Sequence, residues 1–256
     1  MARCIVIANQ KGGVGKTTTA VNLAAALAVM EKKTLLVDCD PQGNASSGVG
    51  VYPENIGESL YSVLYEPERV REAVYETSLP CLHVIPSTAD LVAADIELVD
   101  KPGRETYLRH VLAPLNAEYD FILLDCAPSL GLITLNALCA ASELLVPLQC
   151  EYYALEGIAQ LLRTFELVRR RFNADMRLLG VAMTMYDGRN KLNRNVRQEI
   201  RNCFPDHHFE TLIPRNVRVS EAPSHGQSVI DYDVKSTGAQ AYLELAREVL
   251  ARLSAS

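Results

Sequence analysis

The chain has 256 residues, of which 48% are hydrophobic and 22% are charged, and its formal net charge is −6 at pH 7. This composition fits a globular protein with a sizeable core and excludes intrinsic disorder, and the negative charge argues against binding nucleic acid through bulk charge. No apolar run reaches the length of a membrane span and no signal peptide precedes the first strand pattern, so we expect a cytoplasmic protein with a single domain over residues 1–256.

A glycine-rich loop follows the first strand pattern. Residues 11–18, Lys-Gly-Gly-Val-Gly-Lys-Thr-Thr, separate an apolar run at 4–8 from an Ala- and Leu-rich helix pattern at 16–30. Glycines permit tight turns that aim successive N–H groups at one anion, and the helix N-terminus adds partial positive charge. The loop therefore predicts a polyphosphate site, whose candidate ligands are Gly12, Gly13, Val14, Gly15, Lys16, Thr17 and Thr18.

Three side chains of this loop have distinct expected roles. Lys16 is expected to reach the β- and γ-phosphates, Thr17 to place its hydroxyl on Mg²⁺, and Thr18 to bond an α-phosphate oxygen. ATP and Mg²⁺ are therefore the expected cofactors.

The loop departs from the ordinary P-loop pattern. G-x-x-x-x-G-K-[ST] requires glycine at position 10, where this chain has Gln10, and an additional lysine, Lys11, stands at the entrance of the loop. This deviant Walker A pattern resembles that of the ParA/Soj and MinD ATPases and, more distantly, that of nitrogenase iron proteins and arsenite-pump ATPases. The resemblance implies a catalytic role for Lys11, which would cross a homodimer interface to the phosphates of the partner's nucleotide.

Two aspartates follow the second strand pattern, at 34–37. The strand ends in Asp38-Cys39-Asp40-Pro41-Gln42-Gly43-Asn44, beside the phosphate loop, where open α/β sheets bind their ligands. By resemblance to the same family, Asp40 is the catalytic residue that orients or activates the attacking water, and Asp38 supports the site. The alternative is that both aspartates only cap the turn before Pro41.

The middle of the chain predicts helices at 58–64 and 68–75, a strand at 82–86, and helices at 89–99 and 106–115.

A second nucleotide-site motif begins at Tyr119. The sequence Tyr-Asp-Phe-Ile-Leu-Leu-Asp-Cys-Ala-Pro is an apolar strand pattern ended by Asp125, as in a Walker B motif. Such a strand places its carboxylate against the Mg²⁺ shell. Four apolar residues and an aspartate are a weak signal alone, but the preceding P-loop and the family's Ala-Pro-Ser make Asp125 a metal candidate.

Strands at 143–148 and 178–187 and a helix at 153–171 are predicted in the second half of the chain. In the relatives that the chain resembles, loops after such strands contact the adenine. That resemblance makes Thr184, Met185 and the segment Ile213-Pro214-Arg215-Asn216 candidates for the base pocket.

Positive charge is concentrated between residues 188 and 218, although the protein as a whole is acidic. Arg194, Arg197 and Arg201 follow helical spacing and should share one face, which can bind phosphate backbones or can simply be solvated. ParA/Soj proteins bind DNA nonspecifically through arginines in these segments, and Arg189 and Arg218 stand at matching places. The resemblance therefore implies that these two bind nonspecific double-stranded DNA.

The last pattern is a helix at 236–253 with one apolar face, which we expect to pack on the core. A MinD-like protein would instead be expected to end in a basic amphipathic membrane anchor, so we expect no membrane partner.

The strand and helix patterns predict an α/β fold, a doubly wound, mostly parallel sheet with helices on both faces. The resemblance implies a ParA/Soj-type ATPase for chromosome or plasmid partition, with slow intrinsic turnover, an ATP-dependent homodimer, DNA binding on the nucleoid and a ParB-type centromere-binding partner that stimulates hydrolysis. Two alternatives remain open: a MinD-like membrane-cycling positioning ATPase, and a metabolic ATP-dependent synthetase with the same loop.

Overall fold

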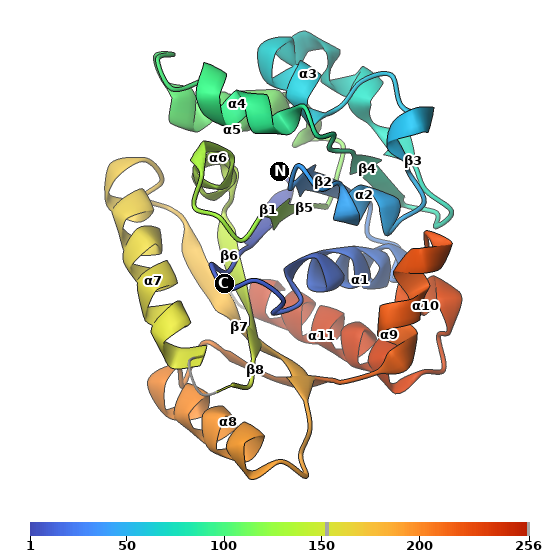
Figure 1. Cartoon of the computed structure of the whole chain (residues 1–256), viewed down its shortest axis with the longest axis vertical. Helices are drawn as coiled ribbons and strands as arrows, with labels where there is room; N and C mark the ends of the chain where they lie inside the picture. Colours follow the sequence, from blue (N-terminus) through green and yellow to red (C-terminus); the bar gives the residue numbers. More distant parts are fainter. Residues whose placement is uncertain (152–153, 255–256) are drawn as a thin grey trace.

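The structure is a computed structural model that describes residues 1–151 and 154–254. Its sheet has eight strands in the order β3-β4-β2-β5-β1-β6-β7-β8 (Figure 1). Neighbouring strands are parallel except β3 and β4. The prediction of a doubly wound, mostly parallel sheet is therefore confirmed. The strands are β1 (Arg3–Ile7), β2 (Thr34–Cys39), β3 (Tyr75–Glu76), β4 (Leu82–Ile85), β5 (Phe121–Cys126), β6 (Glu143–Gln149), β7 (Arg177–Tyr186) and β8 (His208–Pro214).

Helices connect the strands and cover both faces of the sheet. The α-helices are α1 (Lys16–Val29), α2 (Asn44–Ser47), α3 (Leu60–Tyr65), α4 (Leu91–Glu97), α5 (Tyr107–Leu112), α6 (Leu132–Ala140), α7 (Ala154–Arg171), α8 (Lys191–Cys203), α9 (Val217–Glu221), α10 (Val229–Tyr232) and α11 (Thr237–Ser254). The 3-10 helices are η1 (Pro53–Asn55), η2 (Pro67–Ala73), η3 (Arg104–Thr106), η4 (Ala113–Leu115) and η5 (Ala222–His225). The predicted start of α7, Tyr153, lies outside the described residues.

The core forms two layers, one on each face of the sheet, because successive side chains of a strand point to opposite sides. In β1, Val6 joins the layer under α3 to α8, and Ile5 and Ile7 join the layer under α1 and α11. Figure 1 shows α1 and α11 side by side. Tyr242 of α11 is buried in that layer, so the prediction that the last helix packs on the core is confirmed.

Several elements differ from the sequence prediction. The predicted helix at 68–75 is the 3-10 helix η2 followed by the short strand β3, and the predicted helix at 106–115 changes to the 3-10 helix η4 where Pro114 lacks an N–H to donate. Several elements were not predicted, among them the short helices α2 and α10, the helix α6 and the edge strand β8. Apolar residues of α6 are spread around the helix and do not form one stripe, and β8 mixes buried and exposed residues without regular alternation.

The position of β1 in the sheet determines where a ligand can bind. β1 pairs with β5 on one side and β6 on the other, and the chain crosses from one half of the sheet to the other around it. In open α/β sheets this reversal opens a crevice at the carboxyl ends of the strands. The glycine-rich loop leaves β1 at that end.

Candidate nucleotide site

The glycine-rich loop joins β1 to α1 in the conformation that its sequence predicts. Gly13 and Gly15 have φ angles of 74° and 85°, the left-handed region that glycine adopts without strain. Gly15 is the N-cap of α1 and its carbonyl accepts the N–H of Thr19 at 2.8 Å. Nothing lies within 4 Å of the position that a Cβ would take at Gly12 or Gly13, so the loop backbone is open at both glycines.

Lys16 is the first residue of α1, and its side chain folds back over the loop. It is 7% exposed, and its Nζ donates a hydrogen bond to the Lys11 carbonyl at 3.1 Å. Burial lowers the pKa of the Lys16 ammonium, and the nearby Asp125 and Asp40 carboxylates partly offset this effect. The ammonium is therefore close to two of the predicted carboxylates.

Lys11, at the entrance of the same loop, has a different partner from Lys16. Its Nζ makes an ion pair with Glu151, two residues after the end of β6. Both side chains are more than a third exposed. The Lys11 N–H also donates to Asn9 Oδ1 at 3.0 Å, which orients the loop entrance. Within this chain, Lys11 therefore has a carboxylate partner that sequence analysis did not identify.

Asp38 and Asp125 stand opposite each other at the carboxyl ends of β2 and β5. Both side chains are fully buried. Asp38 accepts hydrogen bonds from Ser46 N (2.8 Å), Ser46 Oγ (2.7 Å) and Asp40 N (3.1 Å). Burial raises the pKa of Asp38 to about 6 despite these three donors. Asp38 therefore supports the turn that carries Asp40.

Asp40 is 8% exposed, and its Oδ1 accepts the Gln42 N–H at 3.0 Å. The carboxylate thus caps its own turn, as in the alternative prediction for the two aspartates. Its charge also raises the pKa of the Lys16 ammonium. Both features are compatible in one side chain because a carboxylate accepts several hydrogen bonds.

Asp125 is the carboxylate of this site that makes no hydrogen bond within the described part of the chain, although both of its oxygens are buried. Burial raises the pKa of Asp125 well above the usual range, and the nearby Asp38 carboxylate raises it further. The Thr17 hydroxyl lies close enough to lower this pKa in part, although it makes no hydrogen bond to the carboxylate. A buried, unpaired carboxylate needs a cation or a proton.

These residues fit Mg²⁺ better than a metal held by protein ligands alone. Among the described residues, no group of three or more His, Cys, Asp and Glu side chains could hold a metal. Mg²⁺ usually binds through one or two protein oxygens plus waters and substrate phosphates. The Thr17 hydroxyl and the Asp125 carboxylate, next to an open phosphate loop, supply that incomplete set.

A hollow of about 350 Å³ adjoins the loop. Thr184 closes one side, where its Oγ1 donates to the Val14 carbonyl at 2.8 Å. Met185 has a φ of 51°, a left-handed conformation that is uncommon outside glycine, so the backbone is strained at this point. The structure brings together loop residues and the predicted base-pocket residues around this hollow, whose lining includes Gly15, Thr18, Thr184, Met185, Pro214 and Asn216.

The two arginines predicted to bind DNA lie on separate segments, each with carboxylates of its own. The Arg189 side chain is 92% exposed and its Nη2 contacts Asp187 Oδ2 at 2.8 Å. Arg218 contacts Glu221 at 2.9 Å and Asp233 at 3.4 Å. In the described residues, no ion pair or hydrogen bond joins the two segments directly.

The arginines of α8 contact two different segments of the chain. Arg197 and Arg201 both make ion pairs with Glu210 of β8, which confirms that they share a face. Arg194 instead donates to the carbonyls of Gly188 and Arg189, at 2.7 and 3.1 Å. Much of the predicted positive surface is therefore balanced by carboxylates of the same chain.

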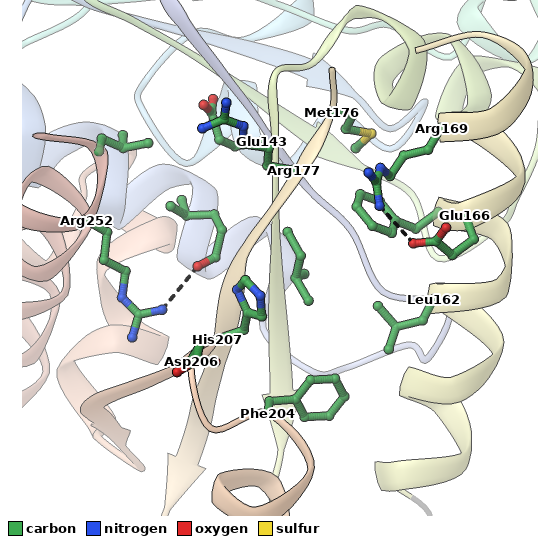
Figure 2. Close-up of a pocket in the computed structure, with 14 residues that line it drawn as sticks. Glu143, Leu162, Glu166, Arg169, Met176, Arg177, Phe204, Asp206, His207 and Arg252 are labelled. Atoms are coloured by element: carbon green, nitrogen blue, oxygen red, sulfur yellow. Dashed lines mark hydrogen bonds and ion pairs between the residues drawn. The ribbon is translucent and has the colours of Figure 1, made fainter. Parts of the chain in front are cut away.

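A larger hollow, of about 750 Å³, lies at the opposite end of the sheet (Figure 2). Glu143 and Arg177, the first residues of β6 and β7, line it together with Glu166 and Arg169 of α7. Figure 2 shows Arg252 facing it from α11. Because it lies at the amino ends of the strands, this hollow does not belong to the phosphate loop.

Sequence reasoning did not identify Glu151 and Ser46. Glu151 follows β6 at the carboxyl edge of the sheet, and its position next to β1 could have indicated a contact with the loop. Ser46 lies in the family-like segment after Asp40, but no local pattern distinguishes a serine that binds Asp38 from one that binds water.

No helix in the described part of the chain combines the length and the hydropathy that a membrane span requires.

Comparison with known proteins places these features in a family. A family model described as an AAA domain matches residues 2–178. The chain is 52% identical over 252 residues to the chromosome partitioning protein ParA of Myxococcus xanthus, covering 98% of this chain and 89% of that protein. It is 49% identical over 251 residues to the sporulation initiation inhibitor protein Soj of Bacillus subtilis, covering 98% and 99%.

Solved structures share the fold. The structure of cobyrinic acid a,c-diamide synthase from Mycobacterium smegmatis with bound ADP and magnesium matches with a TM-score of 0.87 and 36% sequence identity, over 99% of this chain and 96% of that one. The same enzyme, with the same TM-score, identity and coverage, has also been crystallised with an ATP analogue and magnesium.

Proposed function

The chain belongs to the ParA/Soj family of chromosome-partitioning ATPases, and we propose that it is a switch that dimerises with ATP and binds DNA nonspecifically in that state. One observation carries this proposal. The phosphate loop bears two lysines with different partners, with Lys16 over the loop and Lys11 in a partly exposed ion pair. A lysine in the second position can reach the nucleotide of a second chain.

ATP and Mg²⁺ are the cofactors that we propose. The N–H groups of the loop bind the phosphates, and Lys16 moves from the Lys11 carbonyl to the β- and γ-phosphates. Thr17 and Asp125 are the protein groups that would hold Mg²⁺, which when bound neutralises phosphate charge. The structural relative from Mycobacterium smegmatis was crystallised with ADP or an ATP analogue and with magnesium.

The base lies in the hollow beside Thr184. Met185, Pro214 and Asn216 line that hollow together with Gly15 and Thr18, so a nucleotide there would connect the loop to β7 and to the segment after β8.

Hydrolysis requires a group that orients the attacking water, and we propose Asp40. Its carboxylate lies beside Lys16 and is held by the Asp38 and Gln42 contacts of its turn. The motifs of this site supply little beyond Asp40 that could act as a strong general base, so we expect slow intrinsic turnover. A ParB-type centromere-binding protein would accelerate the reaction through a basic peptide.

Dimerisation costs little at Lys11. The Lys11–Glu151 pair is partly exposed, and such pairs contribute about 1 kcal/mol or less. Contacts to a triphosphate, which carries several negative charges, readily replace a contact of that size. Hydrolysis would remove the γ-phosphate that joins the two chains, so the dimer and its DNA affinity would be lost together.

The DNA surface consists of Arg189 and Arg218 from both chains of the dimer. Each arginine pairs with carboxylates at exposed positions, where DNA phosphates can replace them. Binding of this kind reads no bases and weakens as the salt concentration rises. We propose that the protein acts in the cytoplasm, bound to the DNA of the nucleoid.

The test is binding to a labelled duplex of arbitrary sequence with ATP, with ADP and without nucleotide, at two salt concentrations. Binding that needs ATP and weakens with salt supports the proposal. The double variant Arg189→Glu and Arg218→Glu should keep the ATP-dependent dimer and lose DNA. Equal binding in all three nucleotide states, or a double variant with normal DNA affinity, would refute it.

A synthetase is the second candidate, because the chain is 36% identical to the cobyrinic acid a,c-diamide synthase over 99% of its length. Such an enzyme should hydrolyse ATP quickly only when its small-molecule substrate is present. We favour partition, since the relatives of that name are about half identical over nearly the whole chain. ATP turnover measured with cobyrinic acid, and separately with DNA, distinguishes the two.

A further inference from the structure

Asn193, in the first turn of α8, is a buried side chain that no step of the proposed cycle uses. It is 7% exposed and lies two residues after Lys191, where the helix begins. Its Oδ1 accepts the Asp187 N–H at 2.8 Å, and its Nδ2 donates to the Cys150 carbonyl at 2.9 Å. One amide group therefore joins the segment after β7 to the segment after β6.

The two segments that Asn193 joins belong to different parts of the proposed cycle. Cys150 directly precedes Glu151, the partner of Lys11. Asp187 begins the segment 187–190, which we call the Arg189 arm. Asp187 accepts the Arg189 Nε at 3.0 Å and the Nη2 at 2.8 Å.

We infer that Asn193 is a positioning residue through which the departure of Lys11 from Glu151 is transmitted to the Arg189 arm. The inference rests on the proposed function and specifies how its two sites are coupled. With Lys11 on Glu151, Asn193 holds Asp187 where the carboxylate binds the Arg189 guanidinium twice. In that position the Asp187 carboxylate competes with DNA phosphates for Arg189.

The physical basis is the short reach of a side-chain amide. Hydrogen bonds weaken steeply once their geometry is lost, and a buried N–H or carbonyl left without a partner is costly. When Lys11 moves to the partner's nucleotide, Glu151 and the adjoining Cys150 carbonyl are free to shift. The Asn193 side chain must then either move with the Cys150 carbonyl or give up its hydrogen bond to it. Either change alters the hydrogen bond between Asn193 and the Asp187 N–H.

Arg194 reinforces the arm from the same helix. Its Nη1 donates to the carbonyls of Gly188 and Arg189, at 2.7 and 3.1 Å. A shift of the first turn of α8 therefore moves the arm as a unit, since side chains at 193 and 194 both hold it.

The variant Asn193→Asp removes one of the two hydrogen bonds that the Asn193 side chain makes. An aspartate keeps an oxygen for the Asp187 N–H but has no donor for the Cys150 carbonyl, which it repels. Asn202→Asp is the matched control, because Asn202 is exposed on the same helix and gains the same charge. An added charge alone weakens DNA binding equally with ATP and ADP.

The measured quantity is the ratio of DNA affinities with a non-hydrolysable ATP analogue and with ADP, by anisotropy at one salt concentration. Couplings of this kind are typically about 5–150-fold. We expect that ratio in the wild type and in Asn202→Asp, and a ratio lowered by about threefold or more in Asn193→Asp, whose dimer keeps Arg218 but no longer positions Arg189. Sedimentation should show unchanged ATP-dependent dimers in all three.

Glu151→Gln provides a test that does not depend on the folding of Asn193→Asp. It releases Lys11 without nucleotide, so it should raise DNA affinity in the ADP state. No rise would overturn the inference, as would an Asn193→Asp protein that keeps the wild-type ratio. If the wild type itself shows no nucleotide-dependent DNA binding, the proposed function fails first, before any variant is compared.

Discussion

Replacing Asp125 by asparagine should stabilise the nucleotide-free protein and remove its response to magnesium. Both carboxylate oxygens are buried and make no hydrogen bond to a described residue, and burial together with Asp38 raises the pKa well above the ordinary 3.8. The fold must therefore either bury a charge or hold a proton that the unfolded chain would release at neutral pH. Asparagine has nearly the same shape and no charge.

The size of the effect follows from the pKa. Each pH unit corresponds to about 1.4 kcal/mol, so keeping a carboxyl of ordinary pKa 3.8 protonated at pH 7 costs about 4 kcal/mol at most. The new amide also lacks partners in this position, which costs about 1–3 kcal/mol. We therefore expect a net gain of about 2 kcal/mol, or about 4–8 °C in Tm for a chain of this length.

Thermal unfolding measures both parts of this prediction, with no ligand, with ATP analogue plus EDTA, and with ATP analogue plus Mg²⁺. The wild type should gain about 3 kcal/mol from the last addition at a hundredfold excess over Kd, and Asp125→Asn should gain much less. Asp100→Asn, an exposed aspartate on the same chain, should stay within about 0.5 kcal/mol of the wild type throughout. A nucleotide-free Asp125→Asn protein that melts below the wild type, or that keeps the full magnesium shift, would refute the reasoning.

Three further predictions address the same site. Lys16→Ala should abolish nucleotide binding in isothermal calorimetry, because it removes the one buried ammonium that we place on the β- and γ-phosphates; binding within tenfold of the wild type would contradict that role. Asp40→Ala should form ATP dimers that remain on DNA, with phosphate release reduced at least about 100-fold, and turnover near the wild-type rate would exclude Asp40 as the residue that orients water. Burial raises the pKa of Asp38 to about 6 in the fold, so the stability that it contributes is complete below the ordinary value of 3.8 and is lost as the pH rises through 6. Between pH 5 and pH 7, urea unfolding of the nucleotide-free protein should therefore show a loss of stability that is about 1 kcal/mol larger in the wild type than in Asp38→Asn, and equal losses in both proteins would contradict the assignment.

The sequence determined the parts of the site that lie within one loop or at one strand end. The deviant Walker A loop and the Asp38, Asp40 and Asp125 positions depend on local chemistry, in which glycines, a lysine and a threonine stand at a fixed spacing after an apolar strand. The parallel sheet could also be predicted, because buried strands alternating with helices allow few other arrangements. By contrast, β8 was missed because an edge strand exposes residues on both sides and shows no regular alternation.

Only the tertiary structure decided which side chains meet across the sheet. Glu151 lies 140 residues from Lys11, and Asn193 lies 43 residues from Cys150, and no local pattern marks either contact. The order of the strands produces both, since β6 lies beside β1 and β7 beside β6. The same order leaves the Asp125 oxygens without a hydrogen bond to any described residue, because the residues opposite it are Asp38 in β2 and Ile7 in β1, and neither side chain can donate one as an anion or an alkyl group. The sequence thus identified the groups that we propose to bind phosphate, and the packing of the strands determined how those groups are paired within the chain.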